Sequence, residues 1–344
     1  MLNLTSHRAE GFRFGLLDLN DQVVGSLGGV EENSGSLSFS VYADIRGSGN
    51  LTVNNADVDW TRHRVRISYL LGEGDDQTVV PLITAVPRAP VEAHKATGVS
   101  VDLELYDKTL ILSEDTFGVS YAIPAGTNPI TAVSSVITST GQPAPALLTA
   151  TTDTLATAMV WEAGTSKLKI INDVLDAAGY FALFTDGYGQ YRAEPYTSPQ
   201  TRPTMWTFEG DHAVYLPEWT RDADVFAVPN RYVCVGTTDG LLPALSAVAT
   251  DESDGPFSYA SRGRWITKAD VDVEATSQTV LDLLAERRLY EAQQVTETLV
   301  WTHPWLPFGL NEVVQFNGVR AVVWKQSVRL SVGGLITSTA RRLT

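Results

Sequence analysis

The 344-residue chain contains a single cysteine, Cys234, so no disulfide can form within it. Its fold must therefore rest on packing alone, and this suits assembly in a reducing cytoplasm. Cys234 lies between valines in an apolar segment. Burial of that kind raises the pKa of a thiol and makes it unreactive, so we interpret Cys234 as a structural residue.

Metal-binding patterns are also lacking. Zinc sites need closely spaced histidines and cysteines, and the five histidines have no i, i+4 partner. Asp270, Asp272 and Glu274 resemble the start of a calcium loop, but this register places Ala275 at the obligatory glycine and Leu281 at the closing glutamate. We therefore predict no metal site. The histidines are His7, His63, His94, His212 and His303.

Catalytic and cofactor-binding motifs are equally scarce. No G-x-S-x-G sequence is present. The glycine-containing segment 72–76 carries three acidic residues and no lysine, which excludes a phosphate-binding loop and predicts a turn. The acidic segment 251–255 is also interpreted as a turn, although an irregular cation site is an alternative. The sequence thus predicts no catalytic or cofactor-binding residue, no cofactor, and a protein that is not an enzyme.

Basic residues are too few for a polyanion-binding protein, since 25 lysines and arginines face 40 acidic residues and give a net charge of −15. The one compact basic cluster, residues 62–66, alternates with apolar positions, so we interpret it as the solvated face of a strand. Residues 1–10 lack the apolar core of an export signal. Residues 117–152 are uncharged but rich in Thr, Ser, Pro and Gly, which excludes a membrane span.

Alternating apolar and polar residues dominate the first third of the chain and indicate half-buried strands. Val99, Val101, Leu103 and Leu105 alternate with polar residues, and the segments 37–41 and 65–71 repeat the pattern. A chain with 44% hydrophobic and 19% charged residues has the composition of a globular protein. We predict a first small antiparallel β-barrel over residues 1–118.

Helical patterns appear next and predict a small α+β domain over residues 119–200. Asn128-Pro129 opens one helix, because proline is favoured in a first turn. A second helix begins near Ser166 and ends at Gly179, as expected for a C-terminal glycine. Residues 181–194 then predict a hairpin that turns at Asp186-Gly187.

Strand patterns resume toward the C-terminus. Asn317-Gly318, flanked by valine-rich segments, is the favoured two-residue hairpin turn. We predict a second β-barrel that is split in sequence, over residues 201–245 and 295–344, and that includes the strand 231–236. Residues 246–294 are predicted to form an inserted subdomain with a helix over 277–293. The fold class is thus mainly β, with two small antiparallel β-barrels and two smaller α/β subdomains.

This order of domains resembles the baseplate-hub fold shared by tail-tip hub proteins of long-tailed bacteriophages and the spike bases of type VI secretion systems. Two stretches carry local similarity, the helix at 167–178 running into 179–187 and the segment 305–314. Such proteins often have a Gly-Asp pair before the valines of the second stretch, where this chain has Asn311-Glu312. The family has no catalytic signature, so no functional residue is transferred.

The resemblance implies a structural virion protein of the tail tip, assembled in the host cytoplasm. Its relatives form homotrimers whose two barrels per chain build a pseudo-sixfold ring between the hexameric tail tube and the threefold tip. The implied partners are a distal tail or tail-tube protein, the tape measure protein, and other tail-tip and receptor-binding proteins. DNA is expected to pass through without specific binding, and no membrane insertion by this chain is expected. Because the chain ends at its second barrel, needle or hydrolase parts are expected on other chains.

Two rival functions remain open. The eight tryptophans, including Trp301 and Trp305, are typical of a carbohydrate-binding or adhesin module, although two aromatics in one short segment more often fill a core or an interface. A cell-wall hydrolase would need positioned acids or a metal. For the hub function, the surplus of acidic residues predicts a channel wall with few basic residues. Asp102 and Glu104, which share one face of a predicted strand, are candidates for lining this wall.

Overall fold

The computed structural model describes residues 9–55, 57–72, 77–96, 98–141, 146–223, 226–236, 245–273, 278–293, 297–331 and 333–343. Contacts within the chain divide it into two compact units. Unit 1 consists of Met1–Trp219 and Val300–Thr344, and unit 2 consists of Thr220–Leu299. The four-part division predicted from the sequence stays a prediction. No helix in the part of the chain that the structure describes is long and apolar enough to cross a bilayer.

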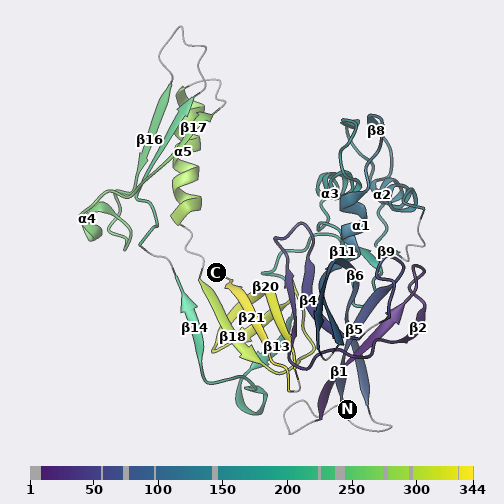
Figure 1. The fold of residues 1–344 in the computed structure, drawn as a ribbon. Helices are drawn as coiled ribbons and strands as arrows, with labels where there is room; N and C mark the ends of the chain where they lie inside the picture. Colours follow the sequence, from purple (N-terminus) through teal and green to yellow (C-terminus); the bar gives the residue numbers. More distant parts are fainter. Residues whose placement is uncertain are drawn as a thin grey trace. The chain divides into compact units, whose positions relative to one another are not determined.

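A 13-stranded sheet forms the body of unit 1 (Figure 1). Its strands come from both ends of the sequence, and β14 and β18 carry the chain into and out of unit 2. The N-terminal strands are β1 (Glu10–Leu17), β2 (Val23–Ser26), β3 (Gly35–Ser40), β4 (Gly47–Asn54), β5 (Arg64–Leu71), β6 (Thr78–Lys95) and β7 (Gly98–Asp107). The later strands are β13 (Thr204–Phe208), β14 (Trp219–Asp222), β18 (Thr298–His303), β19 (Val313–Phe316), β20 (Val319–Leu330) and β21 (Ile336–Arg342), with the 3₁₀ turn η2 (Gly210–His212) after β13.

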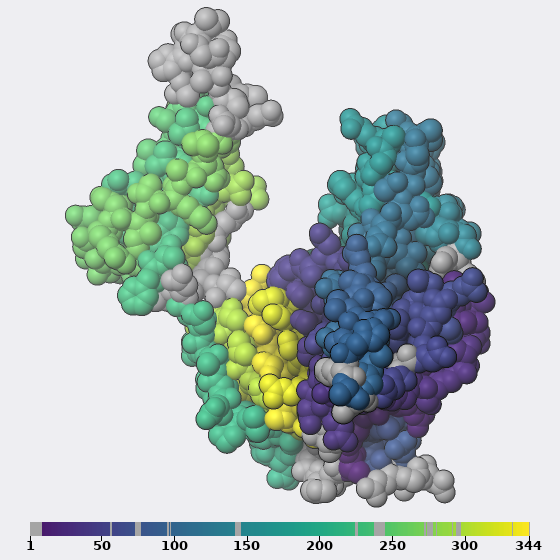
Figure 2. Space-filling view, in the orientation of Figure 1, coloured from purple at the N-terminus to yellow at the C-terminus, as the bar shows by residue number. Residues whose placement is uncertain are grey.

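The two ends of the chain meet in this sheet, because β20 pairs antiparallel with β3, with Val328 opposite Leu37. Figure 2 shows the resulting contact, with the yellow C-terminal segments directly beside the purple N-terminal ones. The mainly β class is therefore confirmed. Among the described strands the pairing forms one continuous sheet, in the order β14-β18-β21-β20-β3-β4-β7-β6-β5-β1-β2 with β13 and β19 branching from β20. The closure of two barrels stays a prediction.

The alternation predicted over residues 99–105 is present in β7. Val101, Leu103 and Leu105 are buried in the main core of unit 1, while Asp102 and Glu104 are exposed on the opposite face. The pattern arises because successive side chains of a strand point to opposite faces. The strands β4 and β6 pair with β7 on its two sides, so β7 is an interior strand of the sheet.

The long strand β6 changes partners along its length. Its first half pairs with β5 and its second half pairs with β7. The register shifts between Arg88 and Val91, where Ala89 has a φ of +49°. A bulge of this kind bends a strand and increases its twist, and this allows one strand to join two parts of the sheet.

Residues 109–197 form a separate layer, which we call the α+β subdomain (Figure 1). It has its own core, to which α2 and α3 contribute most of the buried aliphatic residues. Its elements are α1 (Thr109–Glu114), β8 (Tyr121–Ile123), α2 (Pro129–Thr138), β9 (Ala146–Leu148), β10 (Met159–Trp161), α3 (Lys167–Ala177), β11 (Phe184–Thr185) and β12 (Tyr191–Ala193).

Both predicted helices of this subdomain are confirmed with their caps. Asn128 accepts a hydrogen bond from the backbone N–H of Thr131 at the start of α2, and Ser166 accepts from that of Lys169 at the start of α3. These bonds satisfy N–H groups that have no partner within a helix. Gly179 follows α3 with a φ of +71°, which glycine adopts without strain. The predicted hairpin is present as β11 and β12.

Unit 2 is a three-stranded sheet covered on one face by a helix. Its elements are β15 (Arg231–Gly236), β16 (Ser246–Thr250), α4 (Tyr259–Arg262), β17 (Thr267–Val273) and α5 (Gln278–Gln293). The predicted helix over 277–293 is confirmed as α5, which buries Leu281 and Leu289. The assignment of strand 231–236 to the second barrel is wrong, because β15 pairs with β16 and β17 inside unit 2.

The C-terminal meander contains the predicted hairpin. Asn317 and Gly318 join β19 to β20 with φ values of +48° and +75°, the conformation that a two-residue turn requires. After this turn β20 continues without interruption to Leu330 and pairs near its end with β3. The meander therefore has three strands, and its longest strand connects it to the N-terminal strands.

Candidate functional site

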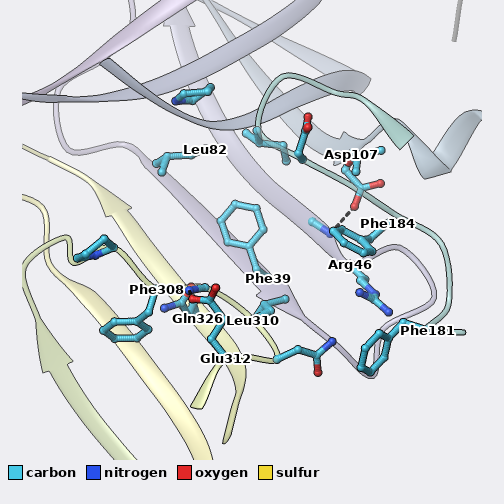
Figure 3. A pocket seen from close by; sticks show the side chains of 18 of the residues that line it. Phe39, Arg46, Leu82, Asp107, Phe181, Phe184, Phe308, Leu310, Glu312 and Gln326 are labelled. Carbon is cyan, nitrogen blue, oxygen red and sulfur yellow. Dashed lines mark hydrogen bonds between the residues drawn. The ribbon is translucent and has the colours of Figure 1, made fainter. Parts of the chain in front are cut away.

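A pocket of about 650 Å³ lies in unit 1, where three parts of the chain meet (Figure 3). The sheet contributes residues of β3 and β6, the α+β subdomain contributes residues 181–186 and 194–197, and the segment 305–312 forms the opposite side. Figure 3 shows an apolar floor between these walls. The apolar residues labelled there are Phe39, Leu82, Phe181, Phe184, Phe308 and Leu310.

Two arginines hold aromatic walls of the pocket in place. The guanidinium of Arg46 lies 5.1 Å from the ring centre of Phe184, and that of Arg202 lies 5.0 Å from the ring centre of Phe181. Both arginines also donate hydrogen bonds to carbonyl oxygens, Arg46 to Ala182 and Arg202 to Asn311. Their charge is thus already used to join the parts of the chain that surround the pocket.

The carboxylates around the pocket are engaged in the same way. Asp107 accepts hydrogen bonds from the backbone N–H groups of Gly47, at 2.6 Å, and Thr109, at 2.8 Å. Glu312 accepts from the N–H of Gly309 at 2.7 Å. The other two carboxylates that line the pocket, Asp186 and Glu194, also have partners within the chain. Asp186 accepts hydrogen bonds from the backbone N–H groups of Tyr188 and Gln190, and Glu194 accepts one from Arg192.

Burial shifts the pKa values of the most enclosed charged groups. It raises the pKa of the Asp107 carboxyl, against the opposing effect of the hydrogen bonds from Thr109 and Gly47 and of the Arg46 charge. Burial lowers the pKa of Arg46. Shifted acids are common in active sites, but both carboxylate oxygens of Asp107 already accept hydrogen bonds, one from the backbone and side chain of Thr109 and the other from the backbone N–H of Gly47.

The walls of the pocket are thus largely apolar, and each of its charged lining residues makes at least one contact within the chain. Among the residues that the structure describes, no group of three or more His, Cys, Asp or Glu side chains is arranged to hold a metal ion.

A buried charge cluster lies beneath the α+β subdomain. Asp21 accepts hydrogen bonds from both Arg64 and Lys108, whose side chains are 2% and 1% exposed. Burial lowers the pKa of Lys108, and the hydrogen bond from its ammonium group to Asp21 opposes this shift. Tyr191 of β12 donates to the carbonyl of Lys108 at 2.8 Å. The cluster thus connects the sheet to the subdomain.

The interpretation of the basic cluster 62–66 as solvated holds for Arg62, whose side chain is 79% exposed, but is wrong for Arg64 and Arg66. Arg64 is buried against Asp21, and Arg66 donates to the carbonyl of Tyr188 and to the Thr84 hydroxyl. The physical reason is that the α+β subdomain covers this face of β5. Residues on both faces of the strand are therefore buried, and the alternation of apolar and polar residues does not distinguish a buried face from a solvated one.

The residues singled out in the sequence take mainly structural roles. Cys234 is buried in the core of unit 2, and burial raises its pKa as predicted. Asp270 accepts a hydrogen bond from Tyr232 and pairs with Arg288, and Asp251 caps a turn through the Ser253 N–H. The predictions of no calcium loop at Asp272 and Glu274 and of a turn at residues 73–76 concern side chains or residues outside those that the structure describes.

The two tryptophans of the segment 301–305 both pack against apolar residues of unit 1. Trp301 is 1% exposed and packs against Phe316 and Phe208, with ring centres 4.8 and 5.6 Å apart. Trp305 lies against the main core of unit 1 and stacks on Tyr69. The core interpretation is confirmed for Trp301, whereas Trp305 is partly buried and lines the pocket.

Sequence reasoning missed the pocket and the charge cluster. Both are made from segments far apart in the chain, such as Asp21 with Lys108 and residues 46–47 with 181–186. The available signal was the adjacency of Asp107 and Lys108 at the end of a half-apolar strand, since charged residues are rarely placed in a core without partners.

Comparison with known proteins bears on this architecture. No protein-family model and no curated protein matches the sequence. Two solved tail proteins each match 96% of the chain. The tail protein from Neisseria meningitidis MC58 has a TM-score of 0.62 and 11% identity, and the match covers 96% of its length. The 43 kDa tail protein of prophage MuSo2 from Shewanella oneidensis has a TM-score of 0.56 and 12% identity, and the match covers 98% of its length. The chain shares the fold of these tail proteins.

A third similarity is to the PdpA–VgrG complex of Francisella, where the match covers 99% of this chain and 53% of that one, with a TM-score of 0.57 and 9% identity. The predicted resemblance to tail proteins is thus confirmed at the level of the fold. Identities of 9 to 12% establish the fold alone.

Proposed function

We propose that this chain is the non-enzymatic hub of a phage tail tip, a homotrimer that joins the hexameric tail tube to the tip and encloses a channel for DNA. The observation that supports this most directly is the shared fold with two tail proteins over 96% of the chain. The protein would reside in the virion tail tip after assembly in the host cytoplasm. Its partners would be the distal tail or tail-tube protein, the tape measure protein and the receptor-binding proteins.

Unpaired strand edges support an assembly function. Among the described strands, β2 pairs only with β1 and β13 pairs only with β19. All four residues of β2 are exposed, including Val23 and Val24. Proteins usually cover such edges by pairing, and symmetric association is the commonest way to do so. The same trimer is proposed to close each chain's strands into two barrels.

The acidic face of β7 supports passage of DNA without binding. Asp102 and Glu104 are exposed there, and Thr52 donates a hydrogen bond to Asp102 from the neighbouring strand. Carboxylates repel phosphates, whereas each basic contact would add salt-dependent affinity. We propose that this face lines the channel or borders it.

The two rival functions have less support. Trp301, one of the two tryptophans that motivated carbohydrate binding, is buried in the core, and Trp305 is partly buried beside the pocket. A hydrolase would need free acids, and the carboxylates around the pocket are bound within the chain.

Native mass spectrometry of the purified chain, alone and co-expressed with its tail-tube partner, tests the proposal. We expect a species with three times the mass of one chain. Images of assembled tails should show three copies around a channel with a neutral or acidic wall. Monomers or dimers in both preparations, or a predominantly basic channel, would contradict the proposal. Glycan binding or cell-wall cleavage by the isolated chain would instead favour a rival function.

A further inference from the structure

A second groove of unit 1, of about 460 Å³, lies over the neighbouring strands β18, β21, β20 and β3. Arg329 is the only charged residue among the described residues that line it, and five side-chain hydroxyls line it as well. A guanidinium group donates hydrogen bonds and accepts none, and hydroxyls can also donate. The groove is therefore equipped for a negatively charged hydrogen-bond acceptor. The hydroxyls belong to Ser36, Thr302, Ser327, Ser331 and Thr337.

The chain itself uses these donors only in part. Arg329 is exposed, and it forms no ion pair and no side-chain hydrogen bond with the residues that the structure describes. The hydroxyls of Ser327 and Ser331 also bond to none of those residues. Arg64 of the same unit, by contrast, pairs with Asp21. The groove thus keeps one full positive charge and two hydroxyl donors for a ligand.

The pairing register separates Arg329 from the acidic face of the sheet. Arg329 lies opposite Ser36 on β3, and Ser36 lies opposite Asn50 on β4. Asn50 in turn lies opposite Glu104 on β7. Neighbouring strands are about 4.8 Å apart, so three steps put the backbones of Arg329 and Glu104 about 14 Å apart. The two charges are on one sheet, but the carboxylate lies too far away to neutralise the guanidinium.

Lys325 extends the positive charge along the same strand. It lies four residues before Arg329, and both side chains are on one face of β20, because successive side chains of a strand alternate. Lys325 also forms no ion pair with the described residues. A strand rises about 3.4 Å per residue, which places the two Cα atoms about 14 Å apart. β20 thus presents two cations at a fixed spacing.

An acidic protein segment suits this surface better than nucleic acid does. Carboxylates bind a guanidinium through two parallel hydrogen bonds, and Leu216 and Leu335 add apolar walls for the stem of the same side chain. Nucleic acid would bring a continuous row of phosphates across the sheet, where the exposed Asp102 and Glu104 repel it. A short segment brings only one or two carboxylates and can remain within the groove.

We propose that this groove is a docking site for an acidic segment of another tail protein, with one carboxylate bound to Arg329 and a second bound to Lys325. The inference rests on the proposed function and specifies the chemistry of one partner of the hub. An extended segment with acidic residues four positions apart has the same spacing of about 14 Å as the two cations. Complementary charge of this kind selects the partner and speeds its association.

Photo-cross-linking in assembled tails identifies the occupant. A photoreactive amino acid replaces Ser331, a lining residue whose hydroxyl has no partner in the described part of the chain. After irradiation, mass spectrometry should find a peptide of a different tail protein with at least two Asp or Glu residues within about five positions. Cross-links to DNA, to a second copy of this chain or to a peptide without acidic residues would overturn the proposal.

Peptide binding to the purified chain tests the two cations. The probe is a capped, fluorescent peptide, Glu-Ser-Gly-Ser-Glu, and fluorescence anisotropy measures its affinity at low ionic strength. Arg329→Gln should weaken binding about 10-fold or more, the effect of losing a hydrogen bond to a charged group. Binding should fall with added salt, and the peptide Gln-Ser-Gly-Ser-Gln should not bind.

Matched variants separate this contact from the overall charge. Arg62→Gln removes the same charge outside the groove, from a side chain that is 79% exposed, and should leave peptide binding within about 2-fold. Arg329→Glu should bind the reversed peptide Lys-Ser-Gly-Ser-Lys instead. The melting temperatures of the Arg329 variants should equal that of the wild type, because this side chain has no partner among the described residues.

The outcomes distinguish the docking site from the hub function. Equal peptide binding by the wild type and Arg329→Gln, or tighter binding of a DNA duplex than of the peptide, overturns the docking site and leaves a trimeric hub standing. A chain that is monomeric and absent from tails overturns the hub, and the inference that rests on it falls with it.

Discussion

Replacing Asp21 by Asn probes the buried charge cluster that joins the sheet to the α+β subdomain. Asp21 is the carboxylate between two nearly inaccessible cations, Arg64 and Lys108. Its φ of +64° lies in the left-handed region, which asparagine tolerates well. The two side chains have almost the same volume, so the substitution removes charge without opening a cavity.

The expected loss is about 3–5 kcal/mol of unfolding free energy, the range found when one partner of a buried ion pair is removed and a charge is left uncompensated. Two cations lose their counter-charge here, so the upper half of that range applies. Urea unfolding followed by tryptophan fluorescence at fixed protein concentration measures it, with an unchanged slope showing that the same surface unfolds. The control Glu32→Gln, on an exposed turn, should change stability by less than about 0.5 kcal/mol.

The pH dependence of the variant provides a second check. The folded pKa of Lys108 lies below its ordinary 10.5, so between the two values the unfolded chain binds the extra proton and stability rises with pH. Without Asp21 the folded pKa falls further, because the hydrogen bond that opposed the shift is lost. The deficit of Asp21→Asn should therefore shrink as the pH is raised toward 10. A deficit below about 1 kcal/mol at pH 7, or one that grows with pH, would refute this account.

Three further predictions concern the packing of both units. Gly187→Ala would place a Cβ 2.0 Å from the Pro81 carbonyl oxygen, so calorimetry should show a loss of about 1–3 kcal/mol, whereas Gly118→Ala, with open space around it, should change little. Burial raises the pKa of Asp107 above its ordinary 3.8, so the folded chain holds a proton that the unfolded chain has lost, and the stability from this residue falls as the pH rises through this range. In urea titrations from pH 4 upward, Asp107→Asn should remove this decrease of the unfolding free energy with pH. Cys234→Ala should cost about 1 kcal/mol and leave tail assembly intact, and the native thiol should react with a disulfide reagent only after unfolding.

Local sequence patterns predicted the helices and turns whose ends are determined by residues close to them in the chain. The caps at Asn128 and Ser166, the glycine at 179 and the Asn317-Gly318 turn each depend on residues within one or two turns of the chain. Alternation located β7, because one of its faces is covered by the core and the other is not.

The errors arose where the partner of a segment decides its role. Arg64 occupies a polar position in an alternating strand pattern, but the α+β subdomain covers its face of the strand and Asp21 lies opposite its side chain. Both partners are distant in the sequence, so the residues around Arg64 do not reveal them. The strand 231–236 was recognised but assigned to the wrong sheet, since apolar alternation does not encode which strand it pairs with. The pocket escaped notice for the same reason, as three distant segments line it.

Several charged side chains of unit 1 connect one part of the chain to another. Arg46, Arg202 and the Asp21 cluster each connect two parts of unit 1, either by reaching a backbone carbonyl of another segment or by joining strand to strand. Such contacts fix orientation, because a charged hydrogen bond is strong only at the right distance and angle.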